Sequence, residues 1–142
     1  MSVCYAFCMK IFYDWYLAKK KIHRRVPSKN IFFYEREIWW IHMGQNIGSE
    51  QNGKGKKFLR PVLILKKHNS KCFLGLALTK TNKDHRYFYT FFCNEDLVSG
   101  ILSQIRLYDS RRIYVKLGSM KKSEFNEIKN AVTITNFGKP RF

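Results

Sequence analysis

The sequence predicts a single α+β domain, mainly β, in which a small antiparallel barrel carries a helix at each end. At 142 residues the chain has the length of one domain and can bury most of its apolar surface without the disulfides or metal ions that smaller domains need. Short runs of aromatic and β-branched residues follow one another with turn residues between them, which is typical of a small barrel. Apolar stripes at helical spacing occur near the two ends of the chain.

The first expected element is an amphipathic helix over Cys8–Arg25. Its apolar residues recur at spacings of four, three and four: Ile11, Trp15, Ala18 and Ile22. Basic residues crowd the end of this segment, which favours a helix C-terminus, and Pro27 discourages continuation. We expect the helix to pack on the domain with its charges solvated. A membrane-surface anchor is the alternative.

Short strands are expected through the middle of the chain. They cover residues 31–34, 37–43, 61–65, 72–79, 86–93, 100–107 and 112–117. The segment Gly44–Lys57 contains four glycines and is expected to be irregular. A last helix should follow, with Ser119 as its N-cap and a buried stripe at Phe125, Ile128 and Val132.

The balance of charge points to a polyanionic partner. The chain holds 27 Lys and Arg against 10 Asp and Glu, a formal net charge of +17, which costs self-repulsion on so small a domain. Nucleic acid is the first candidate; an anionic membrane surface and an acidic protein partner stay open. No apolar run approaches the roughly 20 residues that span a bilayer, and no signal-peptide cleavage site is visible. We therefore expect a cytoplasmic protein.

Cofactor and metal chemistry find little support in the sequence. The four histidines are scattered, and Gly48–Gly53 lacks the spacing of a phosphate-binding loop, so no metal and no cofactor are predicted. Cys4, Cys8, Cys72 and Cys93 form no CxxC and are expected to be reduced thiols in a core. Cys4 and Cys8 could instead share a helix face with two other ligands. Without a metal, cleavage of nucleic acid is feasible mainly on RNA, because the 2′-hydroxyl is a built-in nucleophile.

Such cleavage needs a guanidinium fixed near the phosphate, a hydroxyl or amide donor beside it, and a proton acceptor. Arg60 suits the first role, because Pro61 restricts the local backbone and the following strand anchors it. Thr79, at the end of the strand 72–79, can supply the hydroxyl, with Ser49 nearby if the turn folds back. Spacing alone favours plainer roles: a surface arginine and an ordinary strand-end threonine.

Six short motifs shift this balance. They are Glu37-Ile-Trp-Trp, Gly48-Ser-Glu-Gln, Arg60-Pro-Val-Leu-Ile-Leu, Leu76-Ala-Leu-Thr79, Gln104-Ile-Arg106 and Asp109-Ser-Arg-Arg112. In order and approximate spacing they resemble the MazF/PemK toxins of bacterial toxin–antitoxin pairs, over roughly Arg36–Val132. The resemblance implies an SH3-like barrel shared with the CcdB gyrase poisons, a homodimer, and a metal-independent endoribonuclease that cuts single-stranded RNA.

The resemblance also implies site residues. The catalytic arginine of the family falls on Arg60 and its catalytic threonine or serine on Thr79, for attack by the 2′-hydroxyl that leaves a cyclic phosphate and a free 5′-hydroxyl. A guanidinium is a poor base, so we assign Arg60 to charge stabilisation and proton removal to Glu50, water or a substrate group. A carboxylate that pins the turn is an equally good interpretation of Glu50. Contacts to RNA are predicted for Ser49, Gln51, Lys54, Lys56 and Lys57.

The chain departs from the family pattern in three places. The loop between Gln51 and Arg60 is longer and more basic, residues 1–34 lie outside the resemblance, and the resemblance does not explain the tail at 133–142. We predict an N-terminal helical extension over 1–34 and a barrel domain over 35–142. The expected partners are messenger RNA and an acidic antitoxin. Two alternatives use the same barrel: a non-catalytic, CcdB-like poison that binds a protein, and an RNA-binding module without activity.

Overall fold

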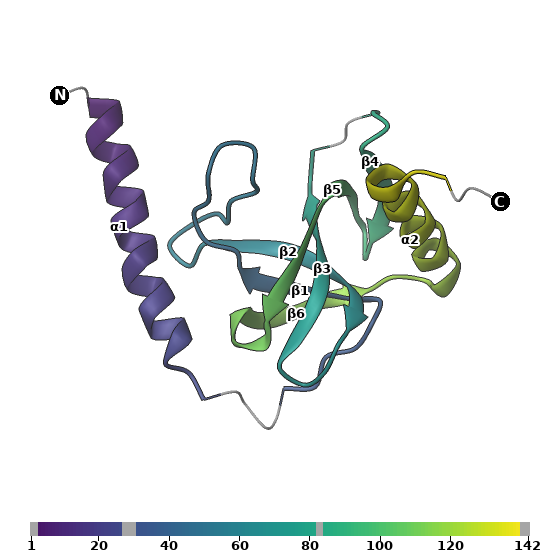
Figure 1. The fold of residues 1–142 in the computed structure, drawn as a ribbon, viewed down its shortest axis with the longest axis horizontal. Coiled ribbons are helices and arrows are strands. Elements are labelled where there is room, and N and C mark those ends of the chain that lie inside the picture. Colours follow the sequence, from purple (N-terminus) through teal and green to yellow (C-terminus); the bar gives the residue numbers. More distant parts are fainter. Residues whose placement is uncertain (1–2, 27–30, 82–83, 140–142) are drawn as a thin grey trace.

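The computed structural model describes residues 3–26, 31–81 and 84–139, and shows a bent sheet between two helices (Figure 1). The helices are α1 (Val3–His23) and α2 (Lys122–Phe137). The strands are β1 (Glu37–His42), β2 (Leu59–Lys67), β3 (Cys72–Thr79), β4 (Phe88–Cys93), β5 (Asp96–Asp109) and β6 (Ile113–Ser119), with a 3-10 turn, η1 (Ser110–Arg112), before β6. The predicted class, α+β and mainly β, is confirmed.

All six strands belong to one antiparallel sheet with the order β4-β5-β3-β2-β1-β6. The long β5 creates the bend: it pairs with β4 over Asp96–Ile101 and with β3 over Ser99–Asp109, with a register shift in between. Within the described residues the edge strands β4 and β6 share no ladder, so the sheet is not closed into the predicted barrel. Asn94, which follows β4, donates a side-chain hydrogen bond to the carbonyl of Leu117 in β6 at 3.0 Å. The two edges thus meet through a side chain.

The predicted strand at 31–34 is wrong. These residues have no regular structure, although Phe33 is buried and its ring centroid lies 5.2 Å from that of Phe73. The backbone N–H of Tyr34 donates to the Glu37 carboxylate at 2.9 Å, and Arg36 adopts φ 74°. A turn therefore occupies the backbone groups that a strand would have needed. Aromatic content indicated burial here but not extended pairing.

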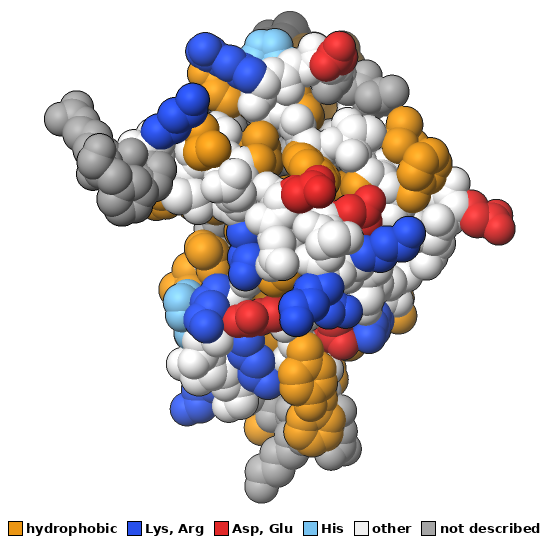
Figure 2. Space-filling view, turned by 90° about the vertical axis from the view of Figure 1, so that its right-hand side faces the viewer, with side chains coloured by type: hydrophobic (Ala, Val, Ile, Leu, Met, Phe, Trp, Pro, Cys, Tyr) orange, Lys and Arg blue, Asp and Glu red, His pale blue; other side chains and the backbone are white. Residues whose placement is uncertain are grey.

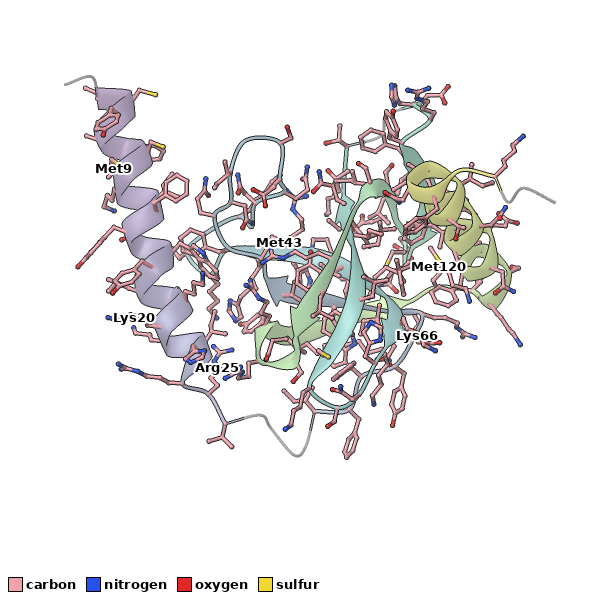
Figure 3. The ribbon with its side chains drawn as sticks, in the orientation of Figure 1. Met9, Lys20, Arg25, Met43, Lys66 and Met120 are labelled. Carbon is pink, nitrogen blue, oxygen red and sulfur yellow. The ribbon has the colours of Figure 1, made fainter. Side chains whose placement is uncertain are left out.

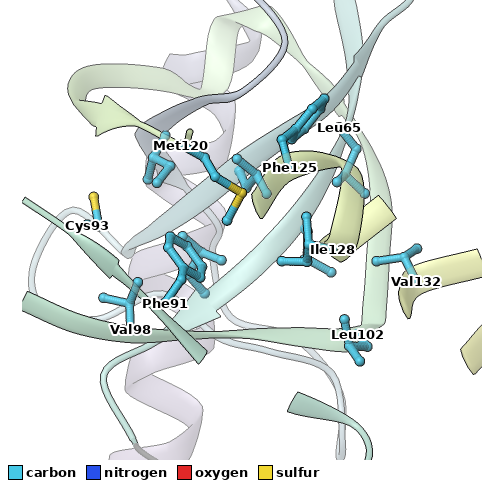
Figure 4. Close-up of a cluster of buried hydrophobic side chains, with 13 residues drawn as sticks. Leu65, Phe91, Cys93, Val98, Leu102, Met120, Phe125, Ile128 and Val132 are labelled. Carbon is cyan, nitrogen blue, oxygen red and sulfur yellow. The ribbon is translucent and has the colours of Figure 1, made fainter. Parts of the chain in front are cut away.

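Helix α2 covers one half of the sheet and completes the larger core cluster (Figure 4). Its predicted stripe is confirmed, since Phe125, Ile128 and Val132 are all buried against β-strand side chains. Ser119 is not the N-cap, however: it ends β6 and pairs with Glu37, while Lys121 precedes the helix without a side-chain cap bond. Ser119 does not cap the helix because it is part of β6 and pairs with β1.

Helix α1 packs on the domain as predicted, but it begins at Val3 instead of Cys8. Its stripe faces the loop between β1 and β2: Trp15 is buried, with its ring centroid 5.3 Å from that of Phe58. Gly44 permits this contact, because it has φ +90° and an added Cβ would lie 2.3 Å from the Trp15 ring. The first turns extend past the sheet, and Phe7 is 65% exposed. In the described chain no helix is long and apolar enough to cross a bilayer.

The cysteines divide into two groups. Cys93 is buried and Cys72 is half-buried, whereas Cys4 and Cys8 are exposed on α1. The expectation that all four thiols lie in a core is therefore wrong for the two on the helix. Among the residues described, no cluster of three or more His, Cys, Asp or Glu side chains is arranged to hold a metal.

Candidate active site

Arg60 lies near the start of β2, opposite Ile41 of β1, and its side chain is held at two points. The guanidinium donates from Nε to the carbonyl of Asn52 at 2.6 Å and from Nη1 to the carbonyl of Leu78 at 3.0 Å. Burial lowers the pKa of Arg60 from its usual value, and Tyr108 opposes that shift. A guanidinium remains a cation under such a shift. The site therefore contains a fixed positive charge with no carboxylate attached to it among the described residues.

Thr79 lies beside Arg60. The β2–β3 register pairs Val62 with Ala77, and two further residues on each antiparallel strand place Arg60 opposite Thr79. Opposite residues share one face of a sheet, with Cβ atoms about 5 Å apart. The Thr79 hydroxyl donates to the Thr81 hydroxyl and accepts from its backbone N–H, both at 3.3 Å. Neither contact is short, so the hydroxyl can turn to another partner.

Arg60 and Thr79 line the same pocket, which has a volume of about 530 Å³. Its other walls come from the loop, β1, β2, β3 with the residue after it, and β6: Trp40, Lys54, Gly55, Leu59, Pro61, Leu78, Lys80, Tyr114 and Val115. The pocket is therefore apolar for much of its surface, with a guanidinium and a hydroxyl at one side. Such a surface can hold a base or sugar while the two polar groups meet a phosphate.

Glu50 does not line the pocket of Arg60 and Thr79. It borders a neighbouring cavity of about 360 Å³ together with Gln51, Gln104 and Arg106. Its carboxylate accepts from the backbone N–H of Ile47 at 3.1 Å. This bond pins the turn, which is the second of the two interpretations that the sequence allowed. The same loop is tied to β5, because Gln104 donates to the carbonyl of Ser49 at 3.1 Å.

The remaining predicted contacts spread along the loop. Gln51 turns its carbonyl toward Asn46, which donates from Nδ2 at 2.7 Å. Lys54 lines the Arg60 pocket, and Lys56 is exposed. Lys57 donates to the hydroxyl of Tyr114 at 2.7 Å, with its Nζ 4.5 Å from the centre of that ring. Two of the three lysines thus lie at or beside the pocket, and the third is free to reach outward.

Sequence reasoning missed several residues that the fold brings to this region. Tyr114 and Val115 come from β6, which pairs with β1 on the side away from β2. His42 lies behind Tyr114, buried, with ring centroids 5.6 Å apart. Its Nδ1 donates to the carbonyl of Lys57 at 2.7 Å, while Nε2 is buried without a partner among the residues described. Burial, together with the charges of Arg25, Lys57 and Arg112, lowers the pKa of His42 and favours a neutral ring.

Comparison with known proteins shows the family of the chain and which solved structures share its fold. Residues 34–135 match the family of PemK-like, MazF-like toxins of type II toxin-antitoxin systems. No curated protein sequence gave a significant match. The structure is similar to MazF from Deinococcus radiodurans, at 16% identity and a TM-score of 0.60, over 75% of this chain and 97% of that one.

A second solved structure shows the same fold. It is an endoribonuclease from a mycobacterial species in complex with its cognate antitoxin, with 14% identity and a TM-score of 0.58. The alignment covers 78% of this chain and all of that one, 100%. Since the family match includes β1 to β6 and most of α2, the chain belongs to the PemK-like, MazF-like toxins of type II toxin-antitoxin systems.

Proposed function

We propose that this toxin is a metal-independent endoribonuclease that cuts single-stranded RNA, including messenger RNA, in the cytoplasm. The observation that carries the proposal is the pairing of Arg60 with Thr79 at one pocket, where two carbonyls hold the guanidinium and no carboxylate of the described residues neutralises it. Family membership and the fold shared with MazF agree with it.

In the proposed reaction, the 2′-oxygen of a ribose attacks the adjacent phosphorus. The P–O5′ bond breaks, which leaves a 2′,3′-cyclic phosphate on one fragment and, after protonation, a free 5′-hydroxyl on the other. Arg60 would stabilise the negative charge that develops on the phosphoryl oxygens, and the Thr79 hydroxyl would donate a further hydrogen bond there. A guanidinium gives up its proton too reluctantly to act as the base.

Proton removal from the 2′-hydroxyl falls to water, to a substrate group or to Glu50. The position of Glu50 favours the first two, because its carboxylate holds the backbone N–H of Ile47 and borders the neighbouring cavity. Glu50 would then act by fixing the loop over the RNA. This assignment keeps Glu50 important for activity without requiring it to move a proton.

RNA would be held by the loop between β1 and β2. Lys54, Lys56 and Lys57 would contact backbone phosphates, which gives affinity and little sequence choice. Ser49 and Gln51 lie toward the neighbouring cavity and are proposed to contact the strand beyond the scissile phosphate. Single-stranded RNA can place its bases in such cavities because they are not held in a duplex.

Two protein partners are also proposed. A chain with net charge +17 should bind an acidic antitoxin, and a mycobacterial neighbour in fold is in complex with its cognate antitoxin. A homodimer follows from the family resemblance and can be checked by light scattering on the purified protein. We further propose that residues 1–34 are an extension to the toxin domain at 35–142, in line with a family match that begins at residue 34.

The test is cleavage of single-stranded RNA by Arg60→Ala in the presence of EDTA. We expect the rate to fall by at least about 100-fold, the usual effect of removing one group that stabilises a transition state. Arg86→Ala is the control, since Arg86 is an exposed loop arginine that stacks on Tyr87 away from the pocket. If Arg60→Ala folds poorly, Arg60→Lys keeps the charge but cannot hold both carbonyls and a phosphate.

Three results would contradict the proposal. Cleavage by Arg60→Ala at the wild-type rate would remove the site assignment. Fragments with 5′-phosphate ends would exclude attack by the 2′-hydroxyl. RNA bound by the wild-type protein without any products would favour the RNA-binding module, and a protein target without RNA binding would favour the CcdB-like poison.

A further inference from the structure

A second cavity lies between the C-terminal half of α1 and η1, and different residues line it and the Arg60 pocket. Its volume is also about 530 Å³, and the two cavities share no lining residue. We call it the α1 groove. Six of its side chains are Lys, Arg or His: Lys19, Lys20, His23, Arg24, Arg111 and Arg112. Figure 3 labels Lys20 and Arg25 near this end of α1.

The positive charge of the α1 groove is almost uncompensated. Asp109 is the one acidic residue in its lining, and Arg111 already holds it through two side-chain bonds of 2.8 and 2.9 Å. None of the other five basic residues forms an ion pair within the described part of the chain. By contrast, the face in Figure 2, on the α2 side of the molecule, shows acidic and basic side chains close together. The groove therefore selects for an anion.

Aromatic rings lie among these charges. The Lys20 Nζ is 4.8 Å from the centre of the Tyr16 ring, and the Arg112 guanidinium is 5.8 Å from that of Trp15. Trp15 is only 7% exposed and serves to attach the helix, whereas Tyr16 is 53% exposed, with its ring centroid 6.4 Å from that of Tyr13. Exposed aromatic rings beside cations are the usual platform on which single-stranded nucleic acid stacks its bases.

Physical contacts connect the α1 groove to the Arg60 pocket. Arg112 of the groove donates to the carbonyl of His42 at 2.9 Å, and the His42 ring meets Tyr114, which lines the pocket. Arg112 and Tyr114 are two residues apart, so their Cα atoms lie within about 7 Å of each other. Lys57, above the Tyr114 ring, adds a cation between the two cavities. One flexible strand can therefore occupy both.

We propose that the α1 groove binds the backbone of the single-stranded RNA whose scissile phosphate lies at Arg60, which rests on the proposed function. Lys19, Lys20 and Arg24 take phosphates, and a base stacks on Tyr16. An acidic peptide would satisfy the charges but would leave the exposed ring and the link to the Arg60 pocket unexplained. RNA supplies a phosphate at every nucleotide and a base for the ring, so the observations favour it.

The test compares two variants of the full chain that each lose three charges. Lys19→Gln/Lys20→Gln/Arg24→Gln alters the α1 groove, and Lys21→Gln/Lys122→Gln/Lys129→Gln is the matched control, because none of its residues lines the groove. The probes are 2′-O-methyl oligouridines, which lack a free 2′-hydroxyl and cannot be cut, of about 5 and about 20 nucleotides. Fluorescence anisotropy at several salt concentrations gives Kd and its salt dependence.

We expect the groove variant to bind the long oligonucleotide about 10-fold more weakly than the control variant, with the slope of log Kd against log salt lower by about 2. Affinity for the short oligonucleotide should be equal in both. Equal affinity for the long oligonucleotide would overturn the proposal. So would a groove variant that loses affinity only for an oligoglutamate peptide, since the groove would then be a site for acidic protein.

The outcomes separate this proposal from the nuclease assignment. Wild-type protein that binds the long oligonucleotide through the α1 groove but cuts no RNA would contradict the proposed enzyme and support the groove. If the wild-type protein cuts RNA but the two variants bind the long oligonucleotide equally well, the nuclease assignment is supported and the proposal for the α1 groove is contradicted.

Discussion

Single side chains decide whether the Arg60 pocket can act on a phosphate. Arg60 donates two hydrogen bonds, from Nε to the carbonyl of Asn52 and from Nη1 to that of Leu78. Its Nη2 has no partner among the described residues. One carbonyl belongs to the loop and the other to β3. If the guanidinium rotates, it breaks its hydrogen bond to at least one of them. A fixed donor stabilises a transition state better than a mobile one, because it needs no reorganisation as charge develops.

The first prediction concerns Thr79. Thr79→Val keeps the shape of the side chain and removes the hydroxyl, so the turnover of RNA should fall about 100-fold. The unfolding free energy should change by less than about 1 kcal/mol, because in the described part of the chain the hydroxyl makes two long contacts, both with exposed Thr81. Initial cleavage rates and thermal melts measure both.

Thr81→Val provides the control for Thr79→Val. It removes the hydroxyl that Thr79 contacts, but Thr81 does not line the pocket. We expect cleavage within a few-fold of the wild-type rate, and Thr79→Ser should also retain most activity. Equal losses in Thr79→Val and Thr81→Val would mean that the turn matters and the Thr79 hydroxyl does not.

Much of this site was predictable from the sequence, for a physical reason. Arg60 and Thr79 are fixed by local features: a proline after the one, a strand end at the other, and motifs around both. Tyr114 and His42 could not be assigned, because their places depend on how β6 and the loop pack against β1. Glu50 carried two interpretations in the sequence, and only its contact to Ile47 favours one of them.

Among the elements, one carboxylate joins β1 to β6 in addition to their backbone ladder. Glu37 is the first residue of β1, and it accepts bonds from Lys116 of β6 at 2.7 Å and from the Trp39 indole at 2.9 Å. Burial raises the pKa of Glu37, but the bonds from Lys116, Trp39 and the backbone of Tyr34 outweigh it, and the net shift is downward from 4.5. The charged carboxylate thus helps to hold the sheet edge.

The second prediction follows from that shift. Glu37→Gln should lower the unfolding free energy by about 1–2 kcal/mol at pH 7, since charge-assisted bonds become neutral ones. A carboxylate whose pKa is depressed by folding stabilises the protein above its unfolded pKa and loses that effect as the pH falls through the folded pKa. The difference between wild type and Glu37→Gln should therefore shrink below about pH 4.5.

Urea titrations from pH 3 to pH 7 would measure this difference. Glu95→Gln is the control, because Glu95 is exposed at the β4–β5 turn and forms no ion pair in the described chain. It should leave the unfolding free energy unchanged at every pH. A constant deficit for Glu37→Gln down to pH 3 would show that shape matters at this position more than charge.

The third prediction concerns how α1 is attached. Gly44→Ala would force a methyl group to within 2.3 Å of the Trp15 ring in a backbone with φ +90°. Since Trp15 and Ile22 are the buried residues of α1, the helix should detach locally. We expect amide hydrogen exchange across Trp15–His23 to accelerate about tenfold or more while exchange in β2 and β3 changes little.

Gly48→Ala separates the clash from backbone strain. Gly48 also has a positive φ, +55°, but nothing lies within 4 Å of an added Cβ. Gly48→Ala should therefore lower the unfolding free energy by about 1–2 kcal/mol, because alanine disfavours the left-handed conformation. It should leave amide exchange in α1 unchanged. Similar acceleration in both variants would indicate that the loop as a whole, and not the Trp15 contact, holds the helix.

Element prediction succeeded where one periodicity dominates and failed where backbone groups had competing uses. The stripes of α1 and α2 were correct because their apolar faces are buried in the structure. The segment 31–34 became a turn anchored on Glu37, and Ser119 was taken by β6. The first error arises from a local side-chain bond to Glu37 and the second from pairing with a strand distant in sequence, and periodicity encodes neither.

For the whole molecule, the distribution of charge matters more than its sum. Five ion pairs occur in the described residues, and in three of them both partners are well exposed, so those three contribute little to stability. The other lysines and arginines repel one another across a domain of net charge +17. The same unpaired charge that destabilises the fold would supply the attraction for the proposed RNA substrate.

The fourth prediction is that salt acts on fold and function with opposite signs. Raising the salt concentration from about 50 to about 200 mM should screen the repulsion and raise Tm by a few degrees. If about five phosphates are contacted, the same change should weaken binding of the long 2′-O-methyl oligouridine about 100-fold, since each contact releases counterions. Calorimetry and anisotropy on one preparation measure both. A Tm that falls with salt would mean that the ion pairs outweigh the repulsion, and an affinity insensitive to salt would mean that the basic surface does not meet the RNA backbone.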